Sequence, residues 1–149
     1  MEVTRVIKVQ SNCRECLDLV MNALSMLNGG VLLMKFFNND LVITYDTSNV
    51  NFSDIAQSVL SLGVGLLLRK VIMNVSVKSD VDFNELEIAM SKAVDGIVSL
   101  MYDRATSKLS IIMYPDMDIN AVINNLTKMG IVINEITTDE LTQVLMARS

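Results

Sequence analysis

The segment LDLVMNALSMLNGGVLLMKFFNNDLVITY, residues 17–45, contains two kinds of hydrophobic periodicity in succession. Apolar residues first recur at helical spacing over residues 17–27, and Asn28-Gly29-Gly30 then ends the predicted helix. Residues 31–37 and 41–45 read as strands, and between them Asn38-Asn39-Asp40 supplies residues that tolerate a left-handed backbone. The segment therefore predicts a helix followed by a β-hairpin.

The flanking residues extend this pattern to a complete fold. Residues 3–9 alternate with a period near two and predict a strand. After the hairpin, Asn51 is the expected N-cap of a second helix with Asp54 as its capping-box partner, and Gly63 is expected to end that helix. Leu66-Leu67-Leu68 closes the unit as a fourth strand. The order β-α-β-β-α-β predicts a ferredoxin-like unit, an antiparallel four-stranded sheet with both helices on one face.

The same order is predicted again in residues 71–136. A shift of 66 positions places Val9 on Val75 and Gly30 on Gly96. Two unrelated units of this fold would show similar spacing, so the shift favours duplication without requiring it. We predict an α+β chain of two tandem ferredoxin-like domains, residues 1–69 and 70–149, with almost no linker. The elements predicted in the second domain are strands 71–78, 97–102, 109–113 and 131–136, helices capped by Asp82 and Asp118 and ended by Gly96 and Gly130, and a short tail helix in residues 139–147.

The composition excludes several classes of function. The 149 residues include 12 Lys or Arg, 17 Asp or Glu, two Cys and no His, with a formal net charge of −5. Without His there is no Ser-His-Asp or Cys-His machinery, and two Cys supply neither a four-ligand zinc site nor a disulfide framework. The acidic balance disfavours nucleic acid, which requires a basic surface. We therefore predict a protein that is not an enzyme and does not bind nucleic acid.

The start of the chain and its apolar stretches predict the compartment. The residues from Met1 to Arg5 lack the basic and long apolar regions of a signal peptide. Lys35, Arg69 and Lys70 interrupt the longest apolar stretches before they reach the length of a membrane span. We therefore expect a cytoplasmic protein with reduced thiols and no membrane insertion.

Both cysteines lie in one C-x-x-C motif, Cys13-Arg14-Glu15-Cys16, between a predicted strand and a predicted helix. The positive end of the helix dipole and the charge of Arg14 favour the thiolate, which binds metals and attacks disulfides. Three interpretations compete: ordinary buried apolar residues, a thioredoxin-like redox pair, or ligands of a soft metal ion. Polar neighbours argue against the first. Charged residues between the cysteines, and the position of the single Pro115 in the other repeat, argue against the second.

Among metal ions, Cu(I) suits this donor set best because it is soft and accepts low coordination numbers. Zn(II) requires four ligands and would have to recruit Glu15, Asp18, water or a second molecule. Exposed C-x-x-C loops can also share one ion between two chains, which leaves a metal-bridged dimer open. Methionines such as Met26, Met73 and Met101 fall within predicted helices or strands, so we expect them to fill the core rather than bind metal.

The first repeat resembles the heavy-metal-associated domain family, which occurs in small copper chaperones and in the N-terminal tails of copper-transporting P-type ATPases. That family has a G-M-x-C-x-x-C loop, a helix of the form V-x-x-A-L-x-x-L-x-G-V and a strand V-x-Y-D. In this chain the motif of Cys13 and Cys16 is followed by Val20, Ala23-Leu24, Leu27, Gly29 or Gly30, Val31, Ile43-Thr44-Tyr45-Asp46, Ile55 and Gly63. The chain departs from the family at Gln10-Ser11, where the family has Gly-Met, and at Val64, where Lys or an aromatic residue is common.

The resemblance implies that Cys13 and Cys16 bind Cu(I), or Zn(II) or another soft metal, and pass it by ligand exchange to a metal-transporting ATPase or another acceptor protein. The equivalent positions of the second repeat are Ser79 and Asp82. Asp82 is expected to cap a helix with Glu85 as its partner, so the second domain looks like a degenerate relative without metal ligands. The alternative function is a non-catalytic interaction or sensory module in which the thiols are incidental.

Overall fold

The computed structural model describes residues 1–10, 13–27, 29–78 and 80–145. Ser11, Asn12, Asn28, Ser79 and the end of the predicted tail helix lie outside the described residues. Within the described ranges the chain forms four helices and seven strands, which confirms the predicted α+β class. None of these helices is long and apolar enough to cross a bilayer. Contacts between Cα atoms divide the chain into unit 1, residues 1–67 with the C-terminal residues from Gln143, and unit 2, residues 68–142.

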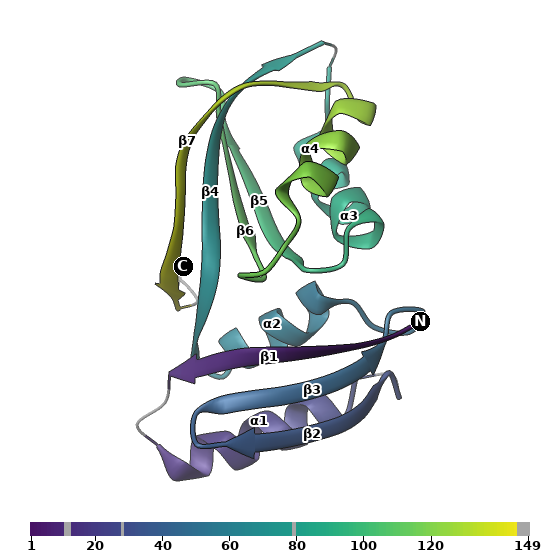
Figure 1. Ribbon diagram of the computed structural model, residues 1–149, viewed down its shortest axis with the longest axis vertical. Coiled ribbons are helices and arrows are strands. Elements are labelled where there is room, and N and C mark those ends of the chain that lie inside the picture. The colour runs from purple at the N-terminus through teal and green to yellow at the C-terminus, as the bar shows by residue number, and fades with distance from the viewer. Residues whose placement is uncertain (11–12, 28, 79, 146–149) are drawn as a thin grey trace. The chain divides into compact units, whose positions relative to one another are not determined.

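Unit 1 has the strand order β2-β3-β1-β4, and neighbouring strands are antiparallel. Helices α1 and α2 contact each other on one face of this sheet (Figure 1). Val20 and Leu24 of α1 and Ile55 and Val59 of α2 are fully buried, so each helix turns one apolar stripe to the core. The elements of unit 1 are β1 (Glu2–Gln10), α1 (Arg14–Ser25), β2 (Val31–Phe37), β3 (Asp40–Asp46), α2 (Phe52–Leu60) and the first residues of β4 (Gly65–Val77).

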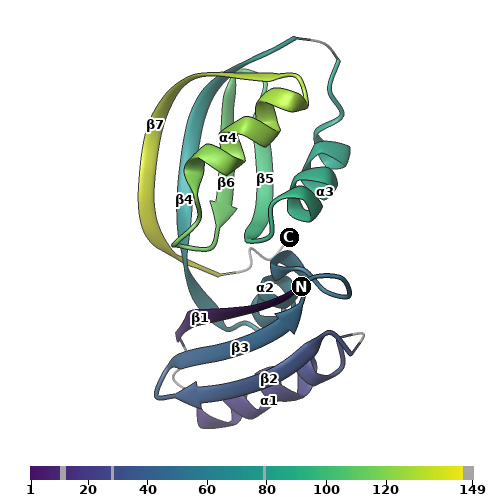
Figure 2. The ribbon, with the colours of Figure 1, turned by 45° about the vertical axis from the view of Figure 1, so that its right-hand side comes forward.

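Unit 2 has the corresponding order β7-β4-β6-β5. Helices α3 and α4 contact each other on one face of its sheet (Figure 2). Its core is a continuous cluster that includes Met73 of β4, Met90 of α3 and Leu126 of α4, all fully buried. The elements of unit 2 are the rest of β4, α3 (Phe83–Ala93), β5 (Ile97–Asp103), β6 (Lys108–Met113), α4 (Ile119–Lys128) and most of β7 (Ile131–Val144).

Irregular backbone features recur in both units at nearly the same sequence offset. A β-bulge lies between Val31 and Leu33 in β2, and another lies 66 positions later between Ile97 and Ser99 in β5. Two backbone hydrogen bonds of unit 1 also have counterparts in unit 2. Val9 N–H donates to Asn39 O at 2.8 Å, and correspondingly Val75 N–H donates to Ser107 O at 3.0 Å. Asp46 N–H donates to Gly30 O, and correspondingly Tyr114 N–H donates to Gly96 O, both at 2.8 Å. Because strand order alone does not require a bulge at one position, these features strengthen the sequence argument for duplication.

Local chemistry sets the helix ends as expected. The side chain of Asn51 accepts the N–H of Asp54, and the carboxylate of Asp54 accepts the N–H of Asn51, which confirms the capping box. Gly63 follows α2 with φ of +79°, a backbone conformation that glycine adopts readily. Asp82 and Asp118 cap α3 and α4.

β4 differs from the prediction because it is one uninterrupted strand of 13 residues. The sequence predicts two strands that meet at residues 68–71. Its first residues, Gly65 and Leu66, pair with β1, and residues from Arg69 onward pair with β6. The domain boundary predicted between residues 69 and 70 therefore falls inside a strand.

The helix predicted in residues 139–147 is wrong for all of its residues up to Val144, which belong to β7. Leu141, Val144 and Leu145 have helical spacing, but β7 is also rich in β-branched residues and pairs with β4. Pairing with a neighbouring strand overrides a weak local helical pattern.

The expectation that Met26 and Met101 fill the core is also wrong. Met26 follows the last turn of α1 as its C-cap and is 82% exposed. Met101 is 75% exposed because it follows the buried Leu100 in β5, where successive side chains point to opposite faces. Met73, in contrast, is fully buried as predicted.

A bidentate ion pair joins a residue of β7 to a residue of β4 in unit 2. The guanidinium of Arg69 donates from Nε and Nη2 to the two carboxylate oxygens of Asp139, both at 2.7 Å, and from Nη1 to the carbonyl of Met117 at 3.0 Å. These hydrogen bonds hold the pKa of Asp139 below its ordinary value of 3.8. The stabilisation is therefore complete above pH 3.8 and is lost as the pH falls through the lower pKa of the folded state.

We expect Asp139→Asn to lower the free energy of unfolding at neutral pH by about 1 kcal/mol or less, because the carboxylate is partly exposed and solvent screens the pair. The difference from the unmodified protein should shrink as the pH falls below 3.8. Urea unfolding at several pH values measures the loss of stability at neutral pH and its decrease at low pH. Asp116→Asn, a neighbouring exposed carboxylate, is the matched control, and an equal loss in both variants would contradict the role of the pair.

Candidate metal centre

The connection between β1 and α1 places both cysteines at the first turn of a helix. Cys13 has an extended backbone, with φ of −122° and ψ of 116°, and is the N-cap of α1. Its Sγ accepts the backbone N–H of Cys16 at 3.2 Å. Cys16 is the third residue of the helix, so the two thiols lie within one turn of each other.

The thiols are accessible from solvent. Cys13 is exposed, Cys16 is partly exposed, and they are not joined in a disulfide. The helix itself is anchored further along by the fully buried Val20 and Leu24. The site thus combines a helix start fixed by the core with thiols open to a partner molecule.

The charges next to the thiols are mixed. Arg14 and Glu15 occupy the first two helical positions, and both are exposed. The positive end of the helix dipole adds to the charge of Arg14, and Glu15 opposes it. Backbone N–H groups at the helix start also point toward this end of the helix, and Sγ of Cys13 accepts one of them, from Cys16.

The donor set limits which ions the centre suits. In the described part of the chain, no group of three or more Cys, Asp, Glu or His side chains is close enough to hold a metal ion. Two sulfur donors match the low coordination number of Cu(I). A four-coordinate Zn(II) site would need two further ligands from water or another molecule.

Unit 2 has a different helix start at the corresponding place. Relative to the buried Val20 and its counterpart Leu86, α3 begins three positions later than α1. Its N-cap, Asp82, stands where unit 1 has Cys16 and accepts the N–H of Asn84 at 3.0 Å. The prediction that Asp82 is a cap is confirmed, but among the described residues the carboxylate of Glu85 does not accept the N–H of Asp82, so the capping box with Glu85 is not formed. Ser79, the counterpart of Cys13, lies outside the described residues.

No family model matches the chain, and no curated protein matches it. Solved structures are similar in fold. The water-soluble region of the P-type ATPase CopA from Bacillus subtilis superposes with a TM-score of 0.52 and 14% identity, covering 89% of this chain and 90% of that one. The solution structure of the N-terminal soluble domains of Bacillus subtilis CopA superposes with a TM-score of 0.51 and 14% identity, covering 92% of this chain and 95% of that one. The chain therefore shares the fold of soluble domains from a P-type ATPase.

Proposed function

We propose that the protein binds Cu(I) through Cys13 and Cys16 and transfers it to an acceptor protein. The observation that carries this proposal is the position of two accessible thiols within the first turn of α1. The fold shared with soluble domains of a P-type ATPase supports it. A metal-transporting ATPase, or another protein with exposed thiols, is the proposed acceptor, and the cytoplasm is the proposed compartment.

Transfer proceeds by ligand exchange without a change of oxidation state. A thiolate of the acceptor adds to the two-coordinate ion, one Cys sulfur leaves, and a second acceptor thiolate then displaces the other. Accessibility of Cys13 permits the first attack. Two chains can use the same chemistry to share one ion, which gives a metal-bridged dimer.

We further propose that units 1 and 2 correspond to two tandem ferredoxin-like domains and that the second carries no metal ligands. The recurring bulges in β2 and β5 and the Asp82 cap support this. In this proposal residues 1–69 hold the cargo, and residues 70–149 have a non-catalytic role.

Competition against a colorimetric Cu(I) chelator, under anaerobic and reducing conditions, tests the function. We expect the chain to withdraw one Cu(I) per molecule, and we expect alkylation of the thiols beforehand to remove this capacity. Zn(II), offered in parallel, should bind more weakly because the site lacks two ligands. If the unalkylated chain removes no Cu(I), the thiols are incidental and the carrier proposal is wrong.

A further inference from the structure

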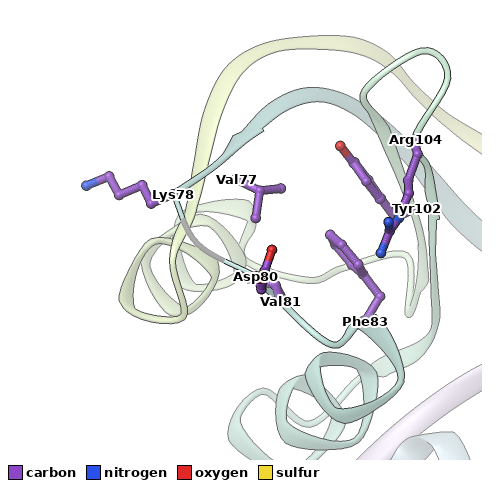
Figure 3. A pocket seen from close by; sticks show the side chains of 7 residues that line it. All are labelled: Val77, Lys78, Asp80, Val81, Phe83, Tyr102 and Arg104. Carbon is purple, nitrogen blue, oxygen red and sulfur yellow. The ribbon is translucent and has the colours of Figure 1, made fainter.

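Unit 2 contains a hollow that the metal-carrier proposal does not use. It has a volume of about 720 Å³ and lies between the end of β4, the start of α3 and the end of β5 (Figure 3). The hollow is shallow and open to solvent, so it would enclose a small molecule only in part. One wall of the hollow is formed by residues of the connection between β4 and α3. The corresponding connection of unit 1, between β1 and α1, carries the two cysteines.

The apolar part of the lining contains a stacked aromatic pair. The rings of Phe83 and Tyr102 are nearly parallel, with centroids 4.2 Å apart and an interplanar angle of 10°. Val77 and Val81 line the same hollow, and all four side chains are only partly buried. The positions 66 residues earlier than Phe83 and Tyr102 are Leu17 and Phe36, so the pair is particular to unit 2. Partly exposed aromatic rings in a concave site favour an apolar or aromatic ligand group.

The charged part of the lining has both signs. Asp80 comes from the connection between β4 and α3, and Arg104 follows β5 and lies beside Tyr102 (Figure 3). In the described part of the chain no ion pair joins Asp80 to Arg104. Lys78 also borders the hollow, but its side chain extends away from it (Figure 3). A ligand that fits both charges carries one anionic and one cationic group.

We propose that unit 2 binds a small zwitterion with an apolar body, the chemistry of a free amino acid with an aromatic side chain. The guanidinium of Arg104 holds the carboxylate, for which its planar fork of donors is suited. Asp80 holds the ammonium group, and the side chain of the ligand packs on Phe83 and Tyr102. This site is independent of the thiols of unit 1.

The test is a titration of the ¹⁵N-labelled full chain with L-phenylalanine, followed by backbone amide shifts. We expect saturable shifts centred on Val81, Phe83 and Tyr102, with a Kd of about 1 mM, as for an exposed site and a ligand of this size. 3-Phenylpropionate lacks the ammonium group and phenethylamine lacks the carboxylate, so each should bind about tenfold more weakly.

Single substitutions test whether the charged side chains of Arg104 and Asp80 bind the ligand. Arg104→Gln and Asp80→Asn should each weaken L-phenylalanine binding about tenfold, because both residues are exposed and their loss leaves the fold intact. Lys78→Gln removes a neighbouring charge that points away, and it should change the Kd less than twofold. Absence of saturable shifts, binding unchanged in both charge variants, or 3-phenylpropionate binding as tightly as L-phenylalanine would each overturn the proposal.

Discussion

Replacing Cys13 with serine is expected to abolish Cu(I) binding while leaving the free energy of unfolding within about 0.5 kcal/mol of the unmodified protein. The two effects separate because Cys13 has two roles. Its Sγ accepts the N–H of Cys16 as the helix cap, and serine, one of the preferred N-cap residues, can accept the same N–H through Oγ. A neutral hydroxyl is, however, a poor ligand for a soft ion. Chelator competition and urea unfolding, performed on the same sample, measure both quantities.

Two companion variants complete this experiment. Cys13→Ala removes both the ligand and the cap, so it should lose the metal and also about 1 kcal/mol of stability. Cys16→Ser should lose the metal alone, because the side chain of Cys16 is not the cap. If Cys13→Ser still withdrew one Cu(I) per chain, Cys13 would not be a ligand and the two-thiolate site would be wrong.

Gly96→Ala is expected to lower the free energy of unfolding by about 2 kcal/mol, chiefly through backbone strain. Gly96 has φ of +123°, outside the left-handed helical region, where a side chain is strained. A Cβ at this position would also overlap Sδ of Met117, but this sulfur lies near the end of a flexible side chain that can move aside at a small cost. Chemical denaturation monitored by circular dichroism gives the measurement.

Gly63→Ala is the matched control for this prediction. Gly63 also has positive φ, +79°, but no atom lies within 4 Å of the place its Cβ would take. Only the backbone strain remains there, so the loss should be about 1 kcal/mol. Shortening the obstructing side chain, in the pair Gly96→Ala with Met117→Ala, tests the overlap separately. Equal losses at Gly63 and Gly96 would contradict the larger backbone strain expected at Gly96.

Helix ends and turns could be predicted from sequence because they depend on residues close together in the chain. Asn51 with Asp54 is a complete local signal, and so is Gly63. The continuity of β4 and the strand character of its partner β7 could not be predicted in this way. Both result from pairing between residues far apart, such as Arg69 with Asp139.

The two candidate sites also differ in whether their residues are close together or far apart in the sequence. Cys13 and Cys16 are three positions apart at a predicted helix start, so the sequence alone brings them together. The pair of Phe83 and Tyr102 is separated by 19 positions, and only the packing of α3 beside β5 stacks the rings. The sequence did show one difference between the units at these positions: a shift of 66 residues places Tyr102 on Phe36 but Phe83 on Leu17. An aromatic residue at a position where the other unit has an aliphatic one indicates a feature of that unit alone.

The cap formed by Cys13 limits how a domain of this kind can evolve. Since the proposed ligand Cys13 is also the N-cap of α1, its replacement by a residue that cannot cap removes the proposed donor and weakens the helix start together. Replacement of Cys13 without loss of stability is then restricted to residues that restore a cap, such as serine, whereas replacement of Cys16 leaves the cap intact. In unit 2 the cap is a carboxylate, and the helix starts three residues later relative to its buried stripe. Of the two cysteines, Cys13 is therefore the one whose replacement we expect the helix start to constrain.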